Sequence, residues 1–322
     1  MARPIPQPAR TIMAVARLLT RLRLIPLPQQ VLSEPHSARL AKTHPWFFGG
    51  RDDLGVRTWN DTVAGRGGPI PIRIYARPDL RPGAPAVLFI HGGGFVNGGL
   101  DFADNIQRGL AARTGYLVVG ISYRLAPEFP FPAALHDCQD VLQWMVDTRP
   151  HGLDPQRIGV GGESAGGNLA AALTIANRDG ARHPIRHQVI IYPFTDTTLT
   201  SPDWDASTMP GGDRAAAERM VHDYAGENKD EPLISVLHAD HAGLPPAMVI
   251  SCEHDPLRTD SIRYAEALLE AGVPTRHRHY DNMPHAYLVM PGIIAEAETS
   301  LDEIAREITE QLGPAMSLNS RE

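Results

Sequence analysis

The sequence predicts an α/β fold in which helices flank a mostly parallel sheet. Short continuous apolar runs, such as PAVLFI at residues 85–90, are typical of strands that are buried on both faces. These runs alternate along the chain with segments of helical character. Strands that alternate with helices form parallel sheets with right-handed crossovers. Because ligands of such sheets bind beyond the carboxyl ends of the strands, functional side chains are expected there.

The expected elements can be followed in chain order. Two extended runs around a Gly-rich turn, 55–63 and 69–78, are expected to form an antiparallel pair. Later strands are expected over 85–90, 116–123, 157–162, 187–193, 246–254 and 275–280. Helices are expected over 101–113, 132–146, 164–180, 257–271 and 294–311.

Length and composition bound the number of domains and the kind of partner. The 322 residues suit one large α/β domain with an extra subdomain, or two ordinary domains. Residues 195–245 are irregular and polar, with a helical piece near 214–224, and we interpret them as an insertion. A net charge of -7 gives no reason to expect nucleic acid as a partner.

The two cysteines, Cys138 and Cys252, favour a reducing compartment. They are too few for a disulfide framework and too far apart for a metal cluster. No apolar run reaches the ~20 residues of a membrane span, and the N-terminus lacks the features of a secretory signal. A cytoplasmic location is therefore expected.

The first thirty residues predict an amphipathic helix. Its apolar face would hold Ile12, Val15, Leu19 and Leu22. This helix is expected to dock on the protein's own core, so that contact with a membrane is not expected. A basic helix on a membrane surface is the alternative, because these residues include five Arg and no acidic residue.

Ser164 is the candidate nucleophile. It lies in GGESAGGNLA at residues 161–170, between an expected strand and an expected helix. This is the G-x-S-x-G nucleophile elbow in its strand–turn–helix setting. Glycines two residues before and after the serine remove Cβ atoms that would clash in the strained turn. The hydroxyl then projects at a helix N-terminus, where amide groups favour developing negative charge.

A second glycine-rich segment, HGGGF at residues 91–95, directly follows the strand PAVLFI. It has the form of an oxyanion loop and precedes the elbow in the chain, as such loops do. The expected donors are the amides of Gly93, Gly94 and Ala165. The alternatives are a flexible loop or a phosphate-binding loop, but the dinucleotide pattern is absent.

An acid and a histidine complete the set in the order serine, acid, histidine. Asp255 and His285 each follow an expected strand, on the same sheet edge as Ser164. Asp260 is expected on a helix, pointing to solvent. His277 and His279 alternate within a strand, so they are expected to face a side of the sheet and not the site.

These motifs together resemble the hormone-sensitive-lipase family of α/β-hydrolases. The blocks that carry the resemblance, over about residues 60–310, are HGGGF, SYRLAPEFPFPAALHD, GGESAGGNLA, YP, DPLR and MPH. The resemblance implies the α/β-hydrolase fold with a helical cap, and hydrolysis of carboxylic esters by Ser164, His285 and Asp255. It also implies an oxyanion hole made by Gly93, Gly94 and Ala165.

The resemblance further implies how the chain is divided. Residues 56–195 and 246–315 would form the hydrolase core, residues 1–55 and 196–245 the cap, and residues 316–322 a tail. Members commonly act on small esters with short to medium acyl chains, and many pair into homodimers through the last strand. Glu163 replaces a commoner Asp, Ala286-Tyr287 a commoner Gly-Phe, and DPLRTD a commoner DPLRDE. Structural roles are expected for Tyr123, Arg124 and Glu128.

The expected function is hydrolysis of a small-molecule ester without a metal or organic cofactor. The alternatives are a membrane-associated lipase that uses residues 10–25, and an amidase or lactone hydrolase with the same triad. A ligand-binding receptor is disfavoured because His285 is present. The side chains that could line the substrate pockets, if they do not serve core packing, are Trp46, Phe47, Phe48, Phe95, Trp204, Met209 and Tyr287.

Overall fold

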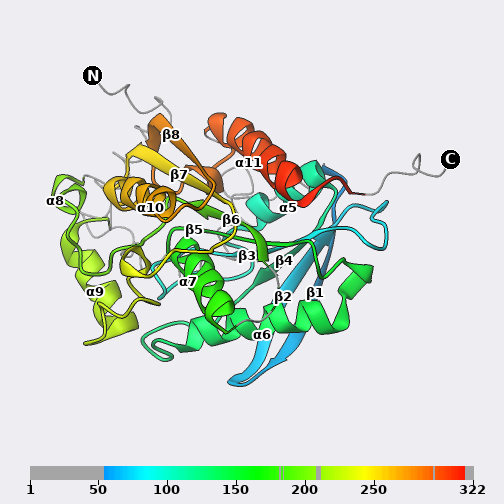
Figure 1. The fold of residues 1–322 in the computed structure, drawn as a ribbon, viewed down its shortest axis with the longest axis horizontal. Coiled ribbons are helices and arrows are strands. Elements are labelled where there is room, and N and C mark those ends of the chain that lie inside the picture. The colour runs from blue at the N-terminus through cyan, green and yellow to red at the C-terminus, as the bar shows by residue number, and fades with distance from the viewer. Residues whose placement is uncertain (1–53, 181–182, 184, 208–211, 293, 316–322) are drawn as a thin grey trace, which may run out of the picture.

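The computed structural model describes residues 54–180, 183, 185–207, 212–292 and 294–315. The predicted N-terminal helix and the pocket candidates Trp46, Phe47, Phe48 and Met209 lie outside the described residues. Within the described residues the strands form one sheet in the order β1-β2-β4-β3-β5-β6-β7-β8 (Figure 1). The predicted α/β fold class is confirmed.

The strands are β1 (Arg57–Gly65), β2 (Gly68–Ala76), β3 (Ala86–Ile90), β4 (Leu117–Ile121), β5 (Ile158–Glu163), β6 (Ile185–Ile191), β7 (Ala247–His254) and β8 (Thr275–Pro284). The helices are α5 (Asp104–Thr114), α6 (Ala133–Thr148), α7 (Ala165–Asp179), α8 (Asp203–Ala206), α9 (Arg214–Ala225), α10 (Arg258–Glu270) and α11 (Glu296–Leu312). Short 3-10 helices are η2 (Pro150–Gly152), η3 (Val236–His238) and η4 (Tyr287–Val289).

The predicted hairpin of β1 and β2 is antiparallel, and β2 continues antiparallel to β4. From β4 to β8 every pairing is parallel. The carboxyl ends of β3, β5, β6, β7 and β8 therefore lie along one edge of the sheet. This is the edge at which the sequence predicts the functional side chains.

Strand side chains alternate between two apolar layers. On β3, Leu88 and Ile90 belong to the layer that α6, α7 and α10 complete. Val87 and Phe89 belong to the layer that α5 and α11 complete on the other face. Figure 1 shows α11 and α5 on one side of the sheet and α6 and α7 on the other. Burial on both faces explains why these strands are continuous apolar runs.

The last strand is longer than predicted. The sequence predicts that it ends at Tyr280, because the polar residues that follow suggest a loop. In the structure β8 continues along β7 as far as the pairing of His254 with Pro284. His285 is consequently the first residue after the strand.

The expectation that Asp260 points to solvent is wrong. Its exposed fraction is 0%, and its carboxylate accepts a hydrogen bond from the Asp196 amide at 3.2 Å. Asp260, Tyr264 and Leu268 are spaced four residues apart on the inner side of α10, and all three are buried. Burial, together with the nearby charge of Asp196, raises the pKa of Asp260.

The expectations for His277, His279 and Arg124 agree with the structure. His277 Nε2 and His279 Nδ1 both lie 2.8 Å from the Ser251 hydroxyl on the neighbouring strand, away from the predicted site. The Arg124 guanidinium and backbone amide bond the buried Asp137 carboxylate. Arg124 therefore anchors the loop after β4 to α6, which is a structural role.

Candidate active site

Ser164, Asp255 and His285 meet at the carboxyl edge of the sheet. They directly follow β5, β7 and β8, respectively. His285 Nε2 lies 3.0 Å from Ser164 Oγ, and His285 Nδ1 lies 2.8 Å from Asp255 Oδ2. With a proton on Nδ1, the imidazole donates to the carboxylate and accepts from the serine hydroxyl. The three side chains form one continuous hydrogen-bonded chain.

The backbone at Ser164 has a conformation that non-glycine residues rarely adopt, with φ of 59° and ψ of -122°. The turn is tight because β5 passes into α7 without a loop. A Cβ atom at Gly162 would overlap the carbonyl of Gly166, and one at Gly166 would overlap the carbonyl of Ile90. The two glycines of the elbow motif are therefore required by the geometry of the turn.

Asp255 is held in place by the start of α10. Its Oδ1 accepts the amide of Leu257 at 2.7 Å, and only 5% of the residue is exposed. The Tyr192 ring lies edge-on to the His285 ring, with centroids 4.9 Å apart. The start of α10 thus holds Asp255, and a residue at the end of β6 packs against His285.

Two opposing effects act on the charge of His285. Burial disfavours the imidazolium, but the Asp255 carboxylate and the hydrogen bond to it, with a contribution from Glu163, outweigh burial. The pKa of His285 is consequently raised above 6.5. A raised pKa makes the neutral imidazole a stronger base toward the Ser164 hydroxyl.

The HGGGF segment forms a compact turn after β3. Gly93 and Gly94 have φ values of 111° and 64°, and the Gly93 carbonyl accepts the amides of Val96 and Asn97. Within the described residues, the amides of Gly93 and Gly94 donate no hydrogen bond. Ala165 is the first residue of α7, where amides have no partner inside the helix. These amides are available for a negatively charged oxygen.

Three side chains at this site were given no role by the sequence analysis. Glu163 is buried, and its Oε1 accepts the Gly92 amide. Tyr192 supports His285, as described above. Met220 on α9 is half-buried and lies where a Cβ atom on Gly94 would overlap its sulfur. The acid directly before the nucleophile was the one visible signal for Glu163, whereas Met220 had none.

The pocket candidates within the described residues serve core packing. Phe95, Trp204 and Tyr287 are all buried. Phe95 stacks on Tyr224 of α9 with ring centroids 3.9 Å apart, and Trp204 packs against Phe194.

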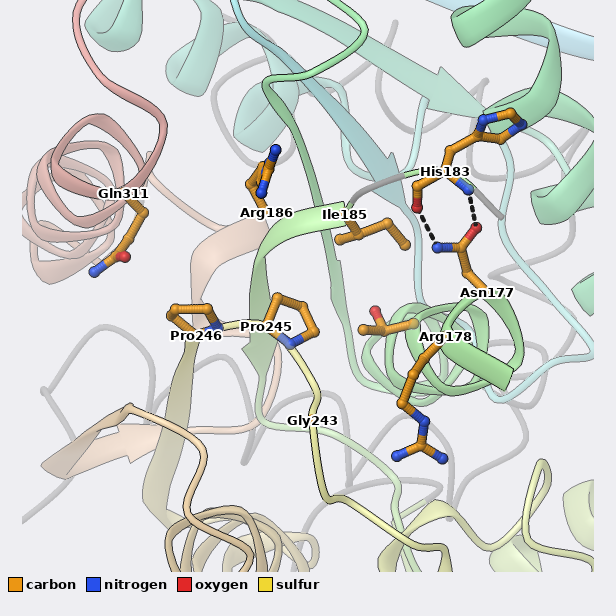
Figure 2. A pocket seen from close by; sticks show the side chains of 10 residues that line it. Asn177, Arg178, His183, Ile185, Arg186, Gly243, Pro245, Pro246 and Gln311 are labelled. Atoms are coloured by element: carbon orange, nitrogen blue, oxygen red, sulfur yellow. Dashed lines mark hydrogen bonds between the residues drawn. The ribbon is translucent and has the colours of Figure 1, made fainter. Parts of the chain in front are cut away.

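Figure 2 shows a separate cavity at the amino-terminal ends of β6 and β7, away from the carboxyl edge of the sheet. Its volume is about 530 Å³. The Arg178 guanidinium at this cavity already donates to the carbonyls of Asp240 and Ala242. None of the triad residues lines the cavity, so it is distinct from the candidate active site.

Metal ligands do not gather at the site. Among the residues that the structure describes, no group of three or more His, Cys, Asp or Glu side chains is placed to hold a metal ion.

A serine on a strained turn between a strand and a helix, bonded to a histidine and through it to an aspartate, is the arrangement of a serine hydrolase with a nucleophile elbow. A family model described as the alpha/beta hydrolase fold matches residues 87–289. The chain belongs to this family, and the resemblance to the hormone-sensitive-lipase group is confirmed.

Several proteins similar to this chain carry esterase names. Carboxylesterase NlhH of Mycobacterium tuberculosis is 36% identical over 251 residues, which are 74% of this chain and 79% of that protein. Esterase LipI of the same organism is 39% identical, over 75% of this chain and 78% of that protein. The solved structure of a hyperthermophilic esterase from the archaeon Pyrobaculum calidifontis has a TM-score of 0.84 at 32% identity, and covers 96% of this chain and 99% of that one.

None of the described helices combines the length and the apolar character that crossing a membrane requires.

The titration of His285 should depend on the charge of Asp255. We expect Asp255→Asn to lower the pKa of His285, because it removes the charge that outweighs burial. The midpoint should move from above 6.5 towards lower pH, as followed by NMR of the imidazole resonances. The matched control is Asp260→Asn, which changes a buried aspartate that has no bond to His285. An unchanged midpoint in Asp255→Asn would contradict the assigned hydrogen bond.

Proposed function

We propose that Ser164, His285 and Asp255 hydrolyse carboxylic esters with short to medium acyl chains through an acyl-enzyme. The observation that carries the proposal is the hydrogen-bonded chain from Ser164 to Asp255, with the serine on a strained elbow. This chain is a carboxylic-ester hydrolase, because its named relatives are carboxylesterases and esterases. The residues that perform each step are our assignment.

In the first step Ser164 Oγ attacks the ester carbonyl carbon, and its proton passes to His285 Nε2. A bond forms between Oγ and the carbonyl carbon, and the electron pair of the double bond moves to the carbonyl oxygen. Asp255 keeps the proton on Nδ1 and stabilises the imidazolium that forms. The short distance between Ser164 and His285 supports this transfer without rearrangement.

The tetrahedral oxygen would be held by the amides of Gly93, Gly94 and Ala165. One such donor lowers the barrier by about 3 kcal/mol in other hydrolases. When the intermediate collapses, the alcohol leaves with the proton that His285 returns to it. A water molecule, activated by His285, then repeats the attack on the acyl-enzyme and releases the acid. No step needs a cofactor.

The insertion at 196–245 would form part of a cap over this site. Tyr224 of α9 stacks on Phe95, which directly follows the oxyanion loop. Met220 lies one helical turn earlier, against Gly94. A side chain at this place narrows the space beside the reacting carbonyl, which supports short and medium acyl chains as substrates.

A second copy of the chain would pair along β8, which is the last strand of the sheet. Arg276 and Arg278 on β8 are neutralised by Glu307 and Glu303 of α11. The strand edge therefore carries less repulsion between two copies than its sequence suggests. A cytoplasmic location stays a prediction, supported by the two cysteines, which are free and buried.

Ser164→Ala should abolish ester hydrolysis. We expect turnover of p-nitrophenyl esters to fall by about 10⁴-fold or more, because the nucleophile is lost, while the thermal melting temperature stays close to that of the native chain. The assay compares acetate to palmitate esters, with rates highest for the shorter chains. Rates that peak at palmitate would favour the membrane-associated lipase, and a folded chain that turns over no ester would contradict the proposal.

Met220→Ala should widen the range of acyl chains. Removing the side chain beside Gly94 should raise kcat/KM for decanoate relative to butyrate by about tenfold, the size of a small apolar contact in a pocket. Arg219→Ala is the matched control, since Arg219 is the exposed neighbour on the same helix. The role of Met220 would be refuted by equal ratios in the two variants.

Pairing through β8 predicts a particle of twice the chain mass of 35.1 kDa in sedimentation equilibrium. The variant His277→Cys, at an exposed position of β8, should form a disulfide-linked dimer on mild oxidation. The matched variant is Asn60→Cys on β1, an exposed position on the opposite edge strand of the sheet. A monomeric mass, or equal linkage in both variants, would exclude a dimer of this kind.

A further inference from the structure

Glu163 is a buried carboxyl group that the proposed mechanism does not use. It is the last residue of β5, directly before Ser164, and its exposed fraction is 1%. Its Oε1 accepts the Gly92 amide at 2.5 Å. A Cβ atom at residue 92 would overlap the Glu163 carboxyl group, so the glycine leaves the room that this bond needs. The contact joins the strand of the nucleophile to the oxyanion loop.

Tyr123 and His91 also form hydrogen bonds at the base of the oxyanion loop. The Tyr123 hydroxyl donates to the His91 carbonyl at 3.0 Å. His91 Nδ1 lies 2.7 Å from the Gly92 carbonyl, and its ring stacks on Tyr123. Since the amide of Gly92 is held by Glu163, both sides of this peptide unit are restrained. The amides of Gly93 and Gly94 come next in the chain, so the restrained peptide unit between His91 and Gly92 helps to set their orientation.

The charge of Glu163 also acts on the triad. Four groups from four other strand ends interact with its charge: Tyr123, Tyr192, Asp255 and His285. His91 precedes Gly92 in the chain, and burial lowers the pKa of its imidazole to about 4, so it is neutral near pH 7. Burial raises the pKa of both tyrosines well above 10, so they are neutral as well. Among the described groups that face Glu163, the charged ones are therefore Asp255 and the protonated form of His285.

We propose that Glu163 is a positioning residue for ester hydrolysis. Its carboxylate ties the oxyanion loop to the strand that carries Ser164, and places a second negative charge beside Asp255 near the His285 ring. The inference rests on the proposed function and deepens it. It assigns a role to the residue before the nucleophile that involves no contact with substrate.

The sign of the electrostatic effect follows from the charges. Ionised Glu163 favours the imidazolium and raises the pKa of His285. Burial, partly opposed by His285 and by the Gly92 amide, raises the pKa of Glu163 itself to about 7. Because the two groups interact, the protonation of either one changes the pKa of the other. Removing the charge of Glu163 should lower the pKa of His285 and move the acid limb of kcat/KM to lower pH.

The test compares three substitutions of Glu163 with one matched control. Glu163→Gln keeps an oxygen that can accept the Gly92 amide but removes the charge. Glu163→Ala removes both, and Glu163→Asp keeps the charge. Glu307→Gln is the control, because Glu307 is a buried carboxylate on α11 that bonds Arg276 away from the site. Folding of each variant is checked by thermal melting.

The first readout is the His285 midpoint from NMR, which does not depend on turnover. We expect it to move to lower pH in Glu163→Gln, and to stay near the native value in Glu163→Asp and Glu307→Gln. A native midpoint in Glu163→Gln overturns the electrostatic role. This outcome stays decisive even if the native chain hydrolyses no ester, in which case the proposed function fails separately.

The second readout is the pair kcat and KM on a short p-nitrophenyl ester. We expect Glu163→Ala to lower kcat by about tenfold to a hundredfold, which is less than the loss of a whole oxyanion donor, with KM changed less than about twofold. Glu163→Asp should rescue most of this loss. A Glu163→Ala variant that folds and keeps the native kcat would contradict the proposal that Glu163 holds the oxyanion loop in place. If Glu163→Ala does not fold, the pH profile of kcat/KM in Glu163→Gln is the deciding measurement. A purely structural role of Glu163 would leave the acid limb of that profile at its native pH.

Discussion

The strained backbone at Ser164 is the constraint on which the rest of the site depends. A non-glycine residue in such a conformation costs about 1–3 kcal/mol and persists only when its surroundings hold it. Here the Ser164 amide donates to Ile191 of β6, and its carbonyl accepts the amides of Asn168 and Phe194. The nucleophile is thus bonded to the next strand end as well as to α7. Without the parallel pairing of β5 and β6, the turn would relax and the hydroxyl would leave the reach of His285.

Buried charge is the second constraint, and the site satisfies it with backbone amides. A buried carboxylate without donors is costly, so each one near the reaction needs hydrogen-bond partners. Asp255 receives the Leu257 amide and the His285 ring, and Glu163 receives the Gly92 amide. These donors come from segments that the sheet already holds in place. The same bonds that offset the cost of burial therefore also orient the catalytic loops.

The sequence predicts the triad because each member directly follows a strand that can be recognised by itself. The prediction that they lie together required only the rule that the carboxyl ends of parallel strands share one edge of the sheet. This applies to Ser164, Asp255 and His285. Asp260 was misjudged because an acid on a helix suggested solvent, whereas its spacing from Tyr264 and Leu268 puts it on the buried face. The partner of Glu163 is a backbone amide 71 residues away, a contact that no local pattern encodes.

The insertion contacts two loops of the candidate active site. Tyr224 of α9 packs on Phe95 beside the oxyanion loop. At the other end of the insertion, Asp203 of α8 accepts the Thr259 amide at 2.9 Å and the Arg258 guanidinium at 3.0 Å, just beyond the loop that holds Asp255. The segment that would shape the acyl pocket therefore also braces two loops of the catalytic apparatus. A substitution that shifts α8 or α9 should disturb the positions of the oxyanion donors and of the triad acid together with the pocket. We therefore expect substrate binding and turnover to change together, because the same contacts would restrain the acyl pocket and the two loops.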